Sequence, residues 1–305
     1  MNTLENWTRR DIIRLAAAAG LLPRITAAED GQMMTRTIPV SGEELPVIGL
    51  GTWQVFDVDS TTTEIKLRQQ IVDLLLQHGG RLIDTSPMYN RSEKVIGDVL
   101  AASGNRHRLF LATKVWTDGK ASGERQMQRS AELMNTEVID LMQVHNRRDL
   151  DVQLGTIREW QEQKRIRYNG VTDYRESAHD EIADVMKRYK PEFIQINYSL
   201  GEHGADDHVL PLAKELGIAV LINRPYMSGQ LFRAVGNREV PEWARSFASS
   251  WGQFFLKFIV SHPAVTTVIP ATSRLRHMTD NLEAGFGEMP DKATRARMIS
   301  FIDSL

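Results

Sequence analysis

Four polar residues of this chain could together donate a proton to a bound substrate. Asp84, Lys114 and His145 each end a short apolar run, and Tyr89 follows Asp84 by five residues. A tyrosine has an unperturbed pKa of about 10, so it needs a neighbouring cation to release a proton near neutral pH. Lys114 can supply that charge, and Asp84 can keep an enclosed lysine protonated. With His145 as a hydrogen-bond donor to a substrate oxygen, these residue types predict an acid–base site.

The rest of the sequence must bring these four residues together. Strand-like runs are expected at 47–51, 81–84, 109–114, 138–144, 166–171, 193–197, 218–222 and 265–269. Amphipathic stretches such as 64–78 and 292–302 separate or follow them, a rhythm typical of βα units in a parallel sheet. Such units can form an open doubly wound sheet or a closed barrel. In a barrel, the catalytic groups come from the C-terminal ends of strands, where Asp84, Lys114 and His145 fall.

Composition limits the classes of protein that the chain could be. The 305 residues exceed the roughly 250 of a (β/α)8 barrel by a short segment only. A net charge of −2 gives no electrostatic reason to expect a nucleic-acid or anionic-membrane partner. The absence of cysteine excludes disulfides, thiolate metal sites and cysteine nucleophiles. The histidines are scattered along the chain, so we expect no metal site.

From about residue 35 onward, the sequence contains a series of short motifs: Gly49-Leu50-Gly51-Thr52-Trp53, Ile83-Asp84-Thr85-Ser86-Pro87-Met88-Tyr89, Ser92-Glu93, Ile96-Gly97, Thr113-Lys114-Val115-Trp116, Val144-His145-Asn146, Gly170-Val171-Thr172-Asp173-Tyr174, Gln195-Ile196-Asn197-Tyr198 and Ile269-Pro270-Ala271-Thr272-Ser273. In type, order and spacing, these motifs resemble those of the aldo-keto reductase family. The resemblance decides between the two sheet types and implies an α/β fold, a (β/α)8 TIM barrel. An N-terminal β-hairpin, at 35–40 and 45–48, would close the barrel floor.

The resemblance also implies a reaction. A nicotinamide nucleotide would deliver hydride to an aldehyde or ketone carbon, while Tyr89 protonates the oxygen. Lys114 and Asp84 would set the acidity of Tyr89, and His145 would orient the carbonyl. Oxidation of an alcohol is the reverse path, and no metal is implied.

Nucleotide-binding roles are implied for twelve residues: Gly51, Thr52, Thr172, Asp173, Gln195, Asn223, Arg224, Thr272, Arg274, Arg276, His277 and Asn281. Asp173 replaces a family asparagine that binds the nicotinamide carboxamide, and an ionised aspartate can accept from that amide but cannot donate to it. Asn223 stands where a tyrosine commonly stacks on the ring, so that stacking is lost. Arg224 is then expected to reach the pyrophosphate, with Tyr226 swinging in as the alternative.

The residues expected near the adenosine 2′-phosphate also depart from the family. The usual lysine is Ala271, while Arg274, Arg276 and His277 supply nearby basic groups. We therefore expect NADP as the cofactor, with NAD as the alternative. Four residues beside the motifs could wall an apolar substrate pocket: Trp53, Phe56, Met88 and Trp116.

The N-terminus resembles a different kind of signal. Thr8-Arg9-Arg10-Asp11-Ile12-Ile13-Arg14 is similar to a twin-arginine export signal, and the apolar stretch 15–22 is too short to span a bilayer. We predict a signal peptide over 1–28, cleaved after Ala28, a reductase domain over 29–305 and a periplasmic location. After cleavage no stable membrane association is expected. The alternatives are an N-terminal helix on the barrel or a cytoplasmic enzyme whose N-terminus mimics a signal.

Two functions of different classes fit these observations. The first is the carbonyl reductase, with a small carbonyl or alcohol substrate and, for an exported protein, the twin-arginine machinery as partner. The second is a nucleotide-binding sensor or scaffold with little turnover, as the related potassium-channel β subunits illustrate. The complete set of four acid–base residues favours the enzyme.

Overall fold

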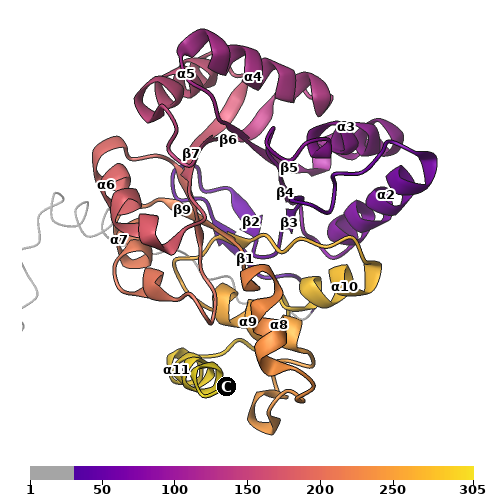
Figure 1. Ribbon diagram of the computed structural model, residues 1–305, viewed down its shortest axis with the longest axis vertical. Helices are drawn as coiled ribbons and strands as arrows, with labels where there is room; N and C mark the ends of the chain where they lie inside the picture. The colour runs from indigo at the N-terminus through magenta and orange to yellow at the C-terminus, as the bar shows by residue number, and fades with distance from the viewer. Residues whose placement is uncertain (1–30) are drawn as a thin grey trace, which may run out of the picture.

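A closed barrel of eight parallel strands forms the centre of the computed structural model, which describes residues 31–305 (Figure 1). The strands pair in chain order: β3 (Leu50–Gly51), β4 (Leu82–Asp84), β5 (Phe110–Val115), β6 (Ile139–His145), β7 (Ile166–Thr172), β8 (Phe193–Asn197), β9 (Ala219–Asn223) and β10 (Thr267–Val268). Hydrogen bonds from Gly49 N to Val268 O (2.8 Å) and from Gly51 N to Pro270 O (3.1 Å) join the last strand to the first. The prediction of a barrel is therefore confirmed.

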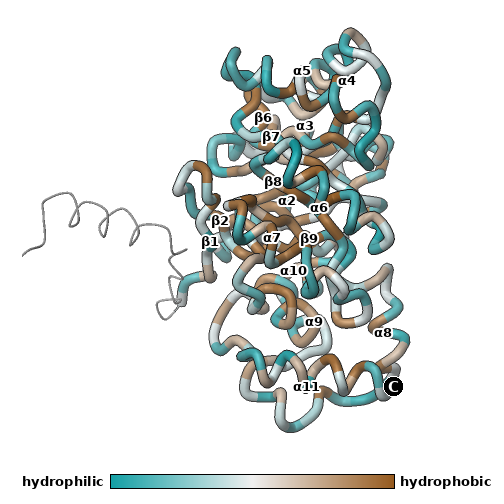
Figure 2. The backbone as a smooth tube through the Cα atoms, turned by 90° about the vertical axis from the view of Figure 1, so that its left-hand side faces the viewer, coloured by the Kyte–Doolittle hydropathy of each residue, from teal (hydrophilic) through white to brown (hydrophobic). Residues whose placement is uncertain are grey.

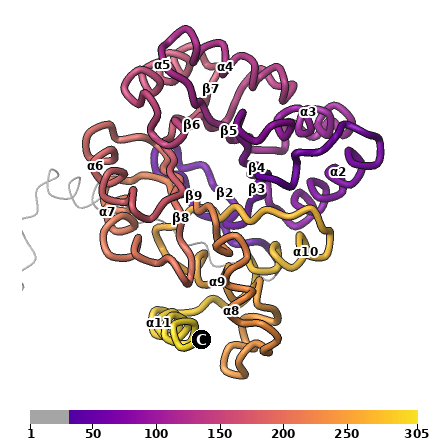
Figure 3. Tube along the Cα trace, viewed as in Figure 1, coloured from indigo at the N-terminus to yellow at the C-terminus, as the bar shows by residue number. Residues whose placement is uncertain are grey.

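Helices surround this barrel as the chain runs once around it, which places α10 beside α2 (Figure 3). The helices are α2 (Thr62–Gln77), α3 (Ser92–Ser103), α4 (Lys120–Leu133), α5 (Leu150–Glu162), α6 (His179–Tyr189), α7 (Val209–Leu216), α8 (Gln230–Val235), α9 (Trp251–Val260), α10 (Leu275–Glu283) and α11 (Lys292–Asp303). Short 3-10 turns lie at Asn105–Arg108, Glu176–Ala178, Gly204–Asp206, Met227–Gly229 and Glu242–Ala244.

Local sequence explains where these helices begin and which face they bury. In α2, the hydroxyl of Thr61 accepts a hydrogen bond from Glu64 N and so caps the first turn. Ile71, Val72 and Leu75 lie on one side of α2 and are buried. The three- and four-residue spacing of apolar positions in 64–78 is thus the cause of both the helix and its packing against the strands.

Apolar side chains fill two layers. The larger layer lies between the strands and the helices. The smaller layer fills the barrel itself, where Leu82, Phe110 and Phe193 meet. The hydropathy colouring in Figure 2 shows many apolar segments among the strands in the middle of the molecule. Because side chains fill the barrel interior, a ligand can enter only at its ends.

A hairpin closes one end of the barrel, as predicted (Figure 2). β1 (Thr35–Thr37) pairs antiparallel with β2 (Glu44–Pro46), and the side chains of Ile38 and Leu45 join the apolar cluster inside the barrel. The hairpin therefore leaves the C-terminal ends of the strands as the open end. Within residues 31–305, no helix has the length and apolar character required to cross a membrane. The predicted signal peptide lies outside the described residues.

Candidate active site

A cavity of about 920 Å³ lies at the C-terminal ends of the strands. Its lining comes from nearly every strand of the barrel and includes Gly51, Asp84, His145, Thr172, Gln195 and Asn223. Tyr89 enters it from the segment between β4 and α3. Parallel strands thus bring together residues that are more than a hundred positions apart in the sequence.

Asp84 and Lys114 form a buried ion pair below this cavity. Lys114 Nζ lies 2.7 Å from Asp84 Oδ2 and also donates to Thr85 O at 2.7 Å. Burial acts to lower the pKa of Lys114, but the charge of Asp84 and the nearby phenol oxygen of Tyr89 outweigh it, and the pKa is raised. The lysine therefore carries a positive charge at neutral pH.

The other carboxylate oxygen of Asp84 receives two amide hydrogen bonds. Gln195 Nε2 donates to Asp84 Oδ1 at 2.8 Å, and Gln143 Nε2 donates to the same atom at 3.1 Å. Both carboxylate oxygens are thus bonded, as a buried charge requires.

Tyr89 lies beside the lysine, with Lys114 Nζ 5.1 Å from the centre of its ring. Burial raises the pKa of Tyr89, and the charge of Lys114 opposes this effect without overcoming it. From the charge of the lysine alone, the sequence predicts a lowered pKa for Tyr89. The pKa is raised instead, because the phenol is buried. At neutral pH Tyr89 is therefore a protonated acid, and Lys114 stabilises the phenolate that forms when the proton leaves.

His145 stands edge-on to Tyr89, with ring centres 6.3 Å apart and an interplanar angle of 87°. Burial, and then the charge of Lys114, lower the pKa of His145 to about 3, while Asp173 acts in the opposite direction. The imidazole is therefore neutral at physiological pH and can donate one hydrogen bond. Tyr89 therefore has a proton to release, and the neutral His145 has one N–H with which to donate a hydrogen bond.

Thr172, Gln195 and Asn223 form the polar end of the cavity. The Thr172 hydroxyl donates to Gln195 Oε1 at 3.3 Å, and Asn223 Nδ2 approaches the same oxygen at 3.4 Å. Asn223 Oδ1 is buried and has no hydrogen-bond partner within the described residues. This oxygen could accept a hydrogen bond from a ligand in the cavity that Asp84, Tyr89 and His145 also line.

Asp173 is not brought to this cavity. Its carboxylate is 1% exposed and pairs with Arg147, while Arg175 donates to it from Nε at 3.1 Å and from Nη2 at 3.0 Å. These arginines occupy the acceptor positions that Asp173 would need to bind a carboxamide, the role expected for it from the sequence.

Arg224 lines the cavity with a left-handed backbone (φ 51°), and its Nε is buried without a hydrogen-bond partner in the described chain. Its nearest carboxylate oxygen, on Glu202, is 3.9 Å from Nη2. Tyr226 also lines the cavity, and its hydroxyl donates to Asn281 Oδ1 at 2.6 Å. Asn281 is thus linked to the cavity lining by Tyr226.

The predicted basic group lies apart from the cavity lining, at the start of α10. Thr272 Oγ1 accepts a hydrogen bond from Arg274 N at 3.1 Å, which shapes the turn into this helix. The side chains of Arg274, Arg276 and His277 are exposed. They are close together in the chain and accessible at the positive end of a helix.

Three of the four predicted wall residues line the cavity. They are Trp53, Met88 and Trp116. Trp53 is 50% exposed and Met88 42% exposed, which places them at the mouth. Phe56 is fully buried in the apolar layer and does not line the cavity, because its ring packs inward, near Arg68.

Several residues of the site were missed in the sequence. Gln143 contacts Asp84, Ser86 contacts His145, and Asn146 and Tyr174 line the cavity. A signal for Gln143 existed, because Leu141, Gln143 and His145 alternate on one face of β6, so a polar residue two before His145 points into the barrel.

Comparison with known proteins agrees with this geometry. The model of the Aldo/keto reductase family matches residues 47–296. The chain is 27% identical to "Methylglyoxal reductase YeaE" of Escherichia coli (strain K12) over 259 residues, which cover 82% of this chain and 89% of that protein.

Solved structures share the fold. An aldo-keto reductase from Klebsiella pneumoniae in complex with NADPH matches with a TM-score of 0.74 at 22% identity, covering 89% of this chain and 95% of that one. The aldo-keto reductase AKR11C1 from Bacillus halodurans, in its holo form, matches with a TM-score of 0.72 at 23% identity, covering 89% and 96%. With a family match over most of its length, the chain belongs to the aldo/keto reductase family of oxidoreductases.

Proposed function

We propose that this protein is a carbonyl reductase that uses NADP, with NAD as the alternative, to interconvert an aldehyde or ketone and its alcohol. The observation that carries the proposal is the convergence of Tyr89, Lys114, Asp84 and His145 at one cavity, with the phenol protonated and the imidazole neutral. A proton donor and a separate neutral hydrogen-bond donor are what reduction of a carbonyl requires.

In this proposal each of the four residues has one task. His145 donates a hydrogen bond to the carbonyl oxygen and holds it beside Tyr89. Tyr89 Oη gives its proton to that oxygen as negative charge develops there. Lys114 stabilises the resulting phenolate, and Asp84 keeps Lys114 charged and fixed. Trp53, Met88 and Trp116 provide apolar walls for the rest of the substrate.

The cavity has the groups that a nicotinamide nucleotide needs. The nicotinamide ring of the nucleotide, when bound, supplies the hydride. Gly51 lines the cavity at the seam of the barrel and lets the backbone around Ile269 approach closely, since a Cβ there would lie 2.7 Å from Ile269 O. Thr172, Gln195 and Asn223 would hold the carboxamide end, and Arg224, whose side chain is 31% exposed, would hold the phosphates through its guanidinium group.

The basic residues at the start of α10 support a preference for NADP over NAD. Within the described residues neither Arg274 nor Arg276 pairs with a carboxylate, so both guanidinium groups are available to a 2′-phosphate. Thr272 and His277 lie beside them. The complexes with NADPH and NADP known for structural relatives support this preference.

Replacement of Tyr89 by phenylalanine tests the proposal. Because Tyr89→Phe removes the proton donor alone, we expect reduction of an aldehyde panel to fall by about 100-fold or more while the Kd for NADPH stays within about twofold. Tyr189→Phe, on α6 and away from the cavity, is the matched control and should retain activity. If the wild-type protein binds nucleotide but turns over no carbonyl or alcohol, the sensor is the better description.

We also propose that the protein is exported through the twin-arginine machinery and cleaved after Ala28. The support is the sequence from Thr8 to Arg14. Outside the cytoplasm no pool of reduced nucleotide is renewed, so the enzyme would keep one nucleotide and recharge it with a second substrate. N-terminal sequencing of the periplasmic fraction tests the export, and release of all nucleotide from mature protein on dialysis would count against retention.

A further inference from the structure

A buried serine lies beside His145. Ser86 is fully buried, and its Oγ lies 3.3 Å from Nδ1 of His145. The same oxygen accepts a hydrogen bond from Met88 N at 3.2 Å. Ser86 is thus the hydrogen-bond partner of His145 on the side of Nδ1.

The backbone donor restricts what the serine hydroxyl can do. Met88 N–H can only donate, so it occupies a lone pair of Ser86 Oγ. The hydroxyl hydrogen then needs an acceptor, and His145 Nδ1 is the one it meets within the described residues. If Nδ1 carried the ring hydrogen, Oγ would receive two donors and its own hydrogen would be buried without a partner. Because an unpaired buried donor is costly, the tautomer with a bare Nδ1 is favoured.

The opposite ring nitrogen is left for the ligand. His145 lines the cavity, and its Nε2 has no hydrogen-bond partner among residues 31–305. The imidazole is neutral, since burial and the charge of Lys114 hold the pKa of His145 near 3. A neutral ring has one N–H, and a bare Nδ1 places it on Nε2.

We propose that Ser86 is a positioning residue that fixes His145 in its Nε2–H tautomer, so that the cavity receives a hydrogen-bond donor where the carbonyl oxygen binds. The inference rests on the proposed function for the use of that donor, but the tautomer itself can be measured without turnover. Ser86 does not touch the substrate and acts only through His145.

The direct test is nitrogen NMR of protein labelled with 15N-histidine, in which long-range proton–nitrogen correlations distinguish the two tautomers. The spectrum of His145→Gln identifies the signals of His145 by subtraction. We expect Nε2–H in the wild-type protein. In Ser86→Ala, where Nδ1 loses its donor, we expect a mixture of tautomers.

Ser92→Ala is the matched control, because Ser92 is also fully buried but its Oγ has no hydrogen-bond partner within the described residues. It should leave the His145 signals unchanged. A wild-type spectrum with Nδ1–H, or a Ser86→Ala spectrum identical to the wild type, would overturn the proposal. The first of these outcomes needs no variant, so the test holds even if Ser86→Ala folds poorly.

Kinetics provide the second measurement. For Ser86→Ala we expect kcat/KM for aldehydes to fall by roughly 10-fold, less than the loss of a whole oxyanion donor, with an unchanged Kd for NADPH. Ser86→Cys, whose S–H is a weak donor, should recover part of the loss. If the Nε2–H tautomer depends on Ser86 and yet no carbonyl is reduced, the proposed function fails while the role of Ser86 stands.

Discussion

At the scale of single residues, the charge of Lys114 acts on the pKa of Tyr89. The charge of Lys114 is the main influence that opposes the burial-driven rise in the pKa of Tyr89. Removing it in Lys114→Met should raise the pKa of Tyr89 further. Oxidation of an alcohol needs the phenolate, so its rate should fall by about 100-fold, and its rise with pH should move to higher pH. A pH–rate profile checks this, and a profile unchanged in position would contradict it.

Lys114 also keeps the buried Asp84 charge paired. Both side chains are almost inaccessible to solvent, and Nζ is 2.7 Å from Oδ2. Removing one partner of such a pair leaves an uncompensated buried charge, so Lys114→Met should lower the free energy of unfolding by about 3–5 kcal/mol. The double variant Asp84→Asn/Lys114→Met should be less destabilised than the sum of the single variants. Urea denaturation measures all three, and strict additivity would show that the pair is not coupled.

The sequence allowed the acid–base residues to be predicted more readily than their neighbours. Asp84, Lys114 and His145 sit at strand ends, and the barrel brings all such ends to one face. Asp173 also follows a strand, but Arg147 and Arg175 engage its carboxylate, and no periodicity reveals an ion pair formed by two loops. Phe56 turns into the apolar layer because of the path of its loop, which its residue type does not determine.

At the scale of elements, all eight predicted strands are present, and the largest differences are at the seam of the barrel. The first strand was expected over 47–51 and the last over 265–269, whereas regular pairing covers Leu50–Gly51 and Thr267–Val268. Single bridges at Ile48 and Ala271 continue the contact beyond these limits. Apolar runs predict which segments are buried, but the extent of regular pairing depends on how the two ends of the sheet meet.

Two glycines in helices should respond to alanine in opposite ways. A Cβ on Gly97 in α3 would overlap the carbonyl of Leu133 at the end of α4, which is backbone and cannot move aside cheaply. We expect Gly97→Ala to lower the free energy of unfolding by about 1–3 kcal/mol or more. A Cβ on Gly155 in α5 would meet nothing within 4 Å. Gly155→Ala should therefore stabilise the protein by about 0.5–1 kcal/mol.

Urea unfolding of both variants compares the two helices under one set of conditions. Equal effects would mean that close approach of α3 to α4 does not govern the response. A stabilised Gly97→Ala would show that the two helices can separate without loss.

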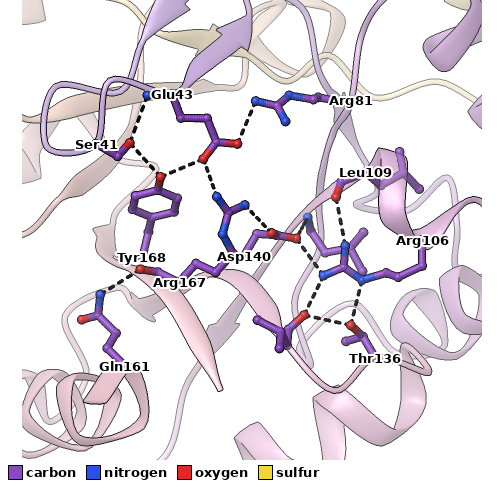
Figure 4. Close-up of polar contacts among 12 residues, drawn as sticks. Ser41, Glu43, Arg81, Arg106, Leu109, Thr136, Asp140, Gln161, Arg167 and Tyr168 are labelled. Atoms are coloured by element: carbon purple, nitrogen blue, oxygen red, sulfur yellow. Dashed lines mark hydrogen bonds and ion pairs between the residues drawn. The ribbon is translucent and has the colours of Figure 1, made fainter. Parts of the chain in front are cut away.

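At the scale of the whole molecule, one carboxylate joins the N-terminal hairpin to distant parts of the barrel floor (Figure 4). Glu43 Oε1 accepts from Arg81 Nη2 at 2.8 Å, and Oε2 accepts from Arg167 Nη2 at 2.5 Å and from the Tyr168 hydroxyl at 2.8 Å. Arg167 also pairs with Asp140 at 2.8 Å. Segments from four parts of the chain therefore meet at the closed end of the barrel.

This network should make stability depend on pH. Burial acts to raise the pKa of Glu43, but the hydrogen bonds from Tyr168 and Arg167 and the charges of Arg167 and Arg81 outweigh it and lower the pKa. A group whose pKa is lower in the folded protein stabilises it above the unfolded pKa, about 4.3 for glutamate, and loses that contribution as pH falls through the folded value. Glu43→Gln should thus lower the free energy of unfolding by about 1.5–3 kcal/mol at pH 7, the usual contribution of hydrogen bonds to a charged group.

The difference between wild type and Glu43→Gln should shrink as the pH falls below about 4.3, because protonated Glu43 then resembles the amide. Glu239→Gln is the matched control, because this side chain is 86% exposed and, within residues 31–305, pairs only with Arg245. Its effect should be small at every pH. If the stability difference between wild type and Glu43→Gln stays constant from pH 7 into the acid range, the shape of this side chain, and not its charge, holds the hairpin to the barrel floor. The ionic network would then play no part in determining which end of the barrel stays open.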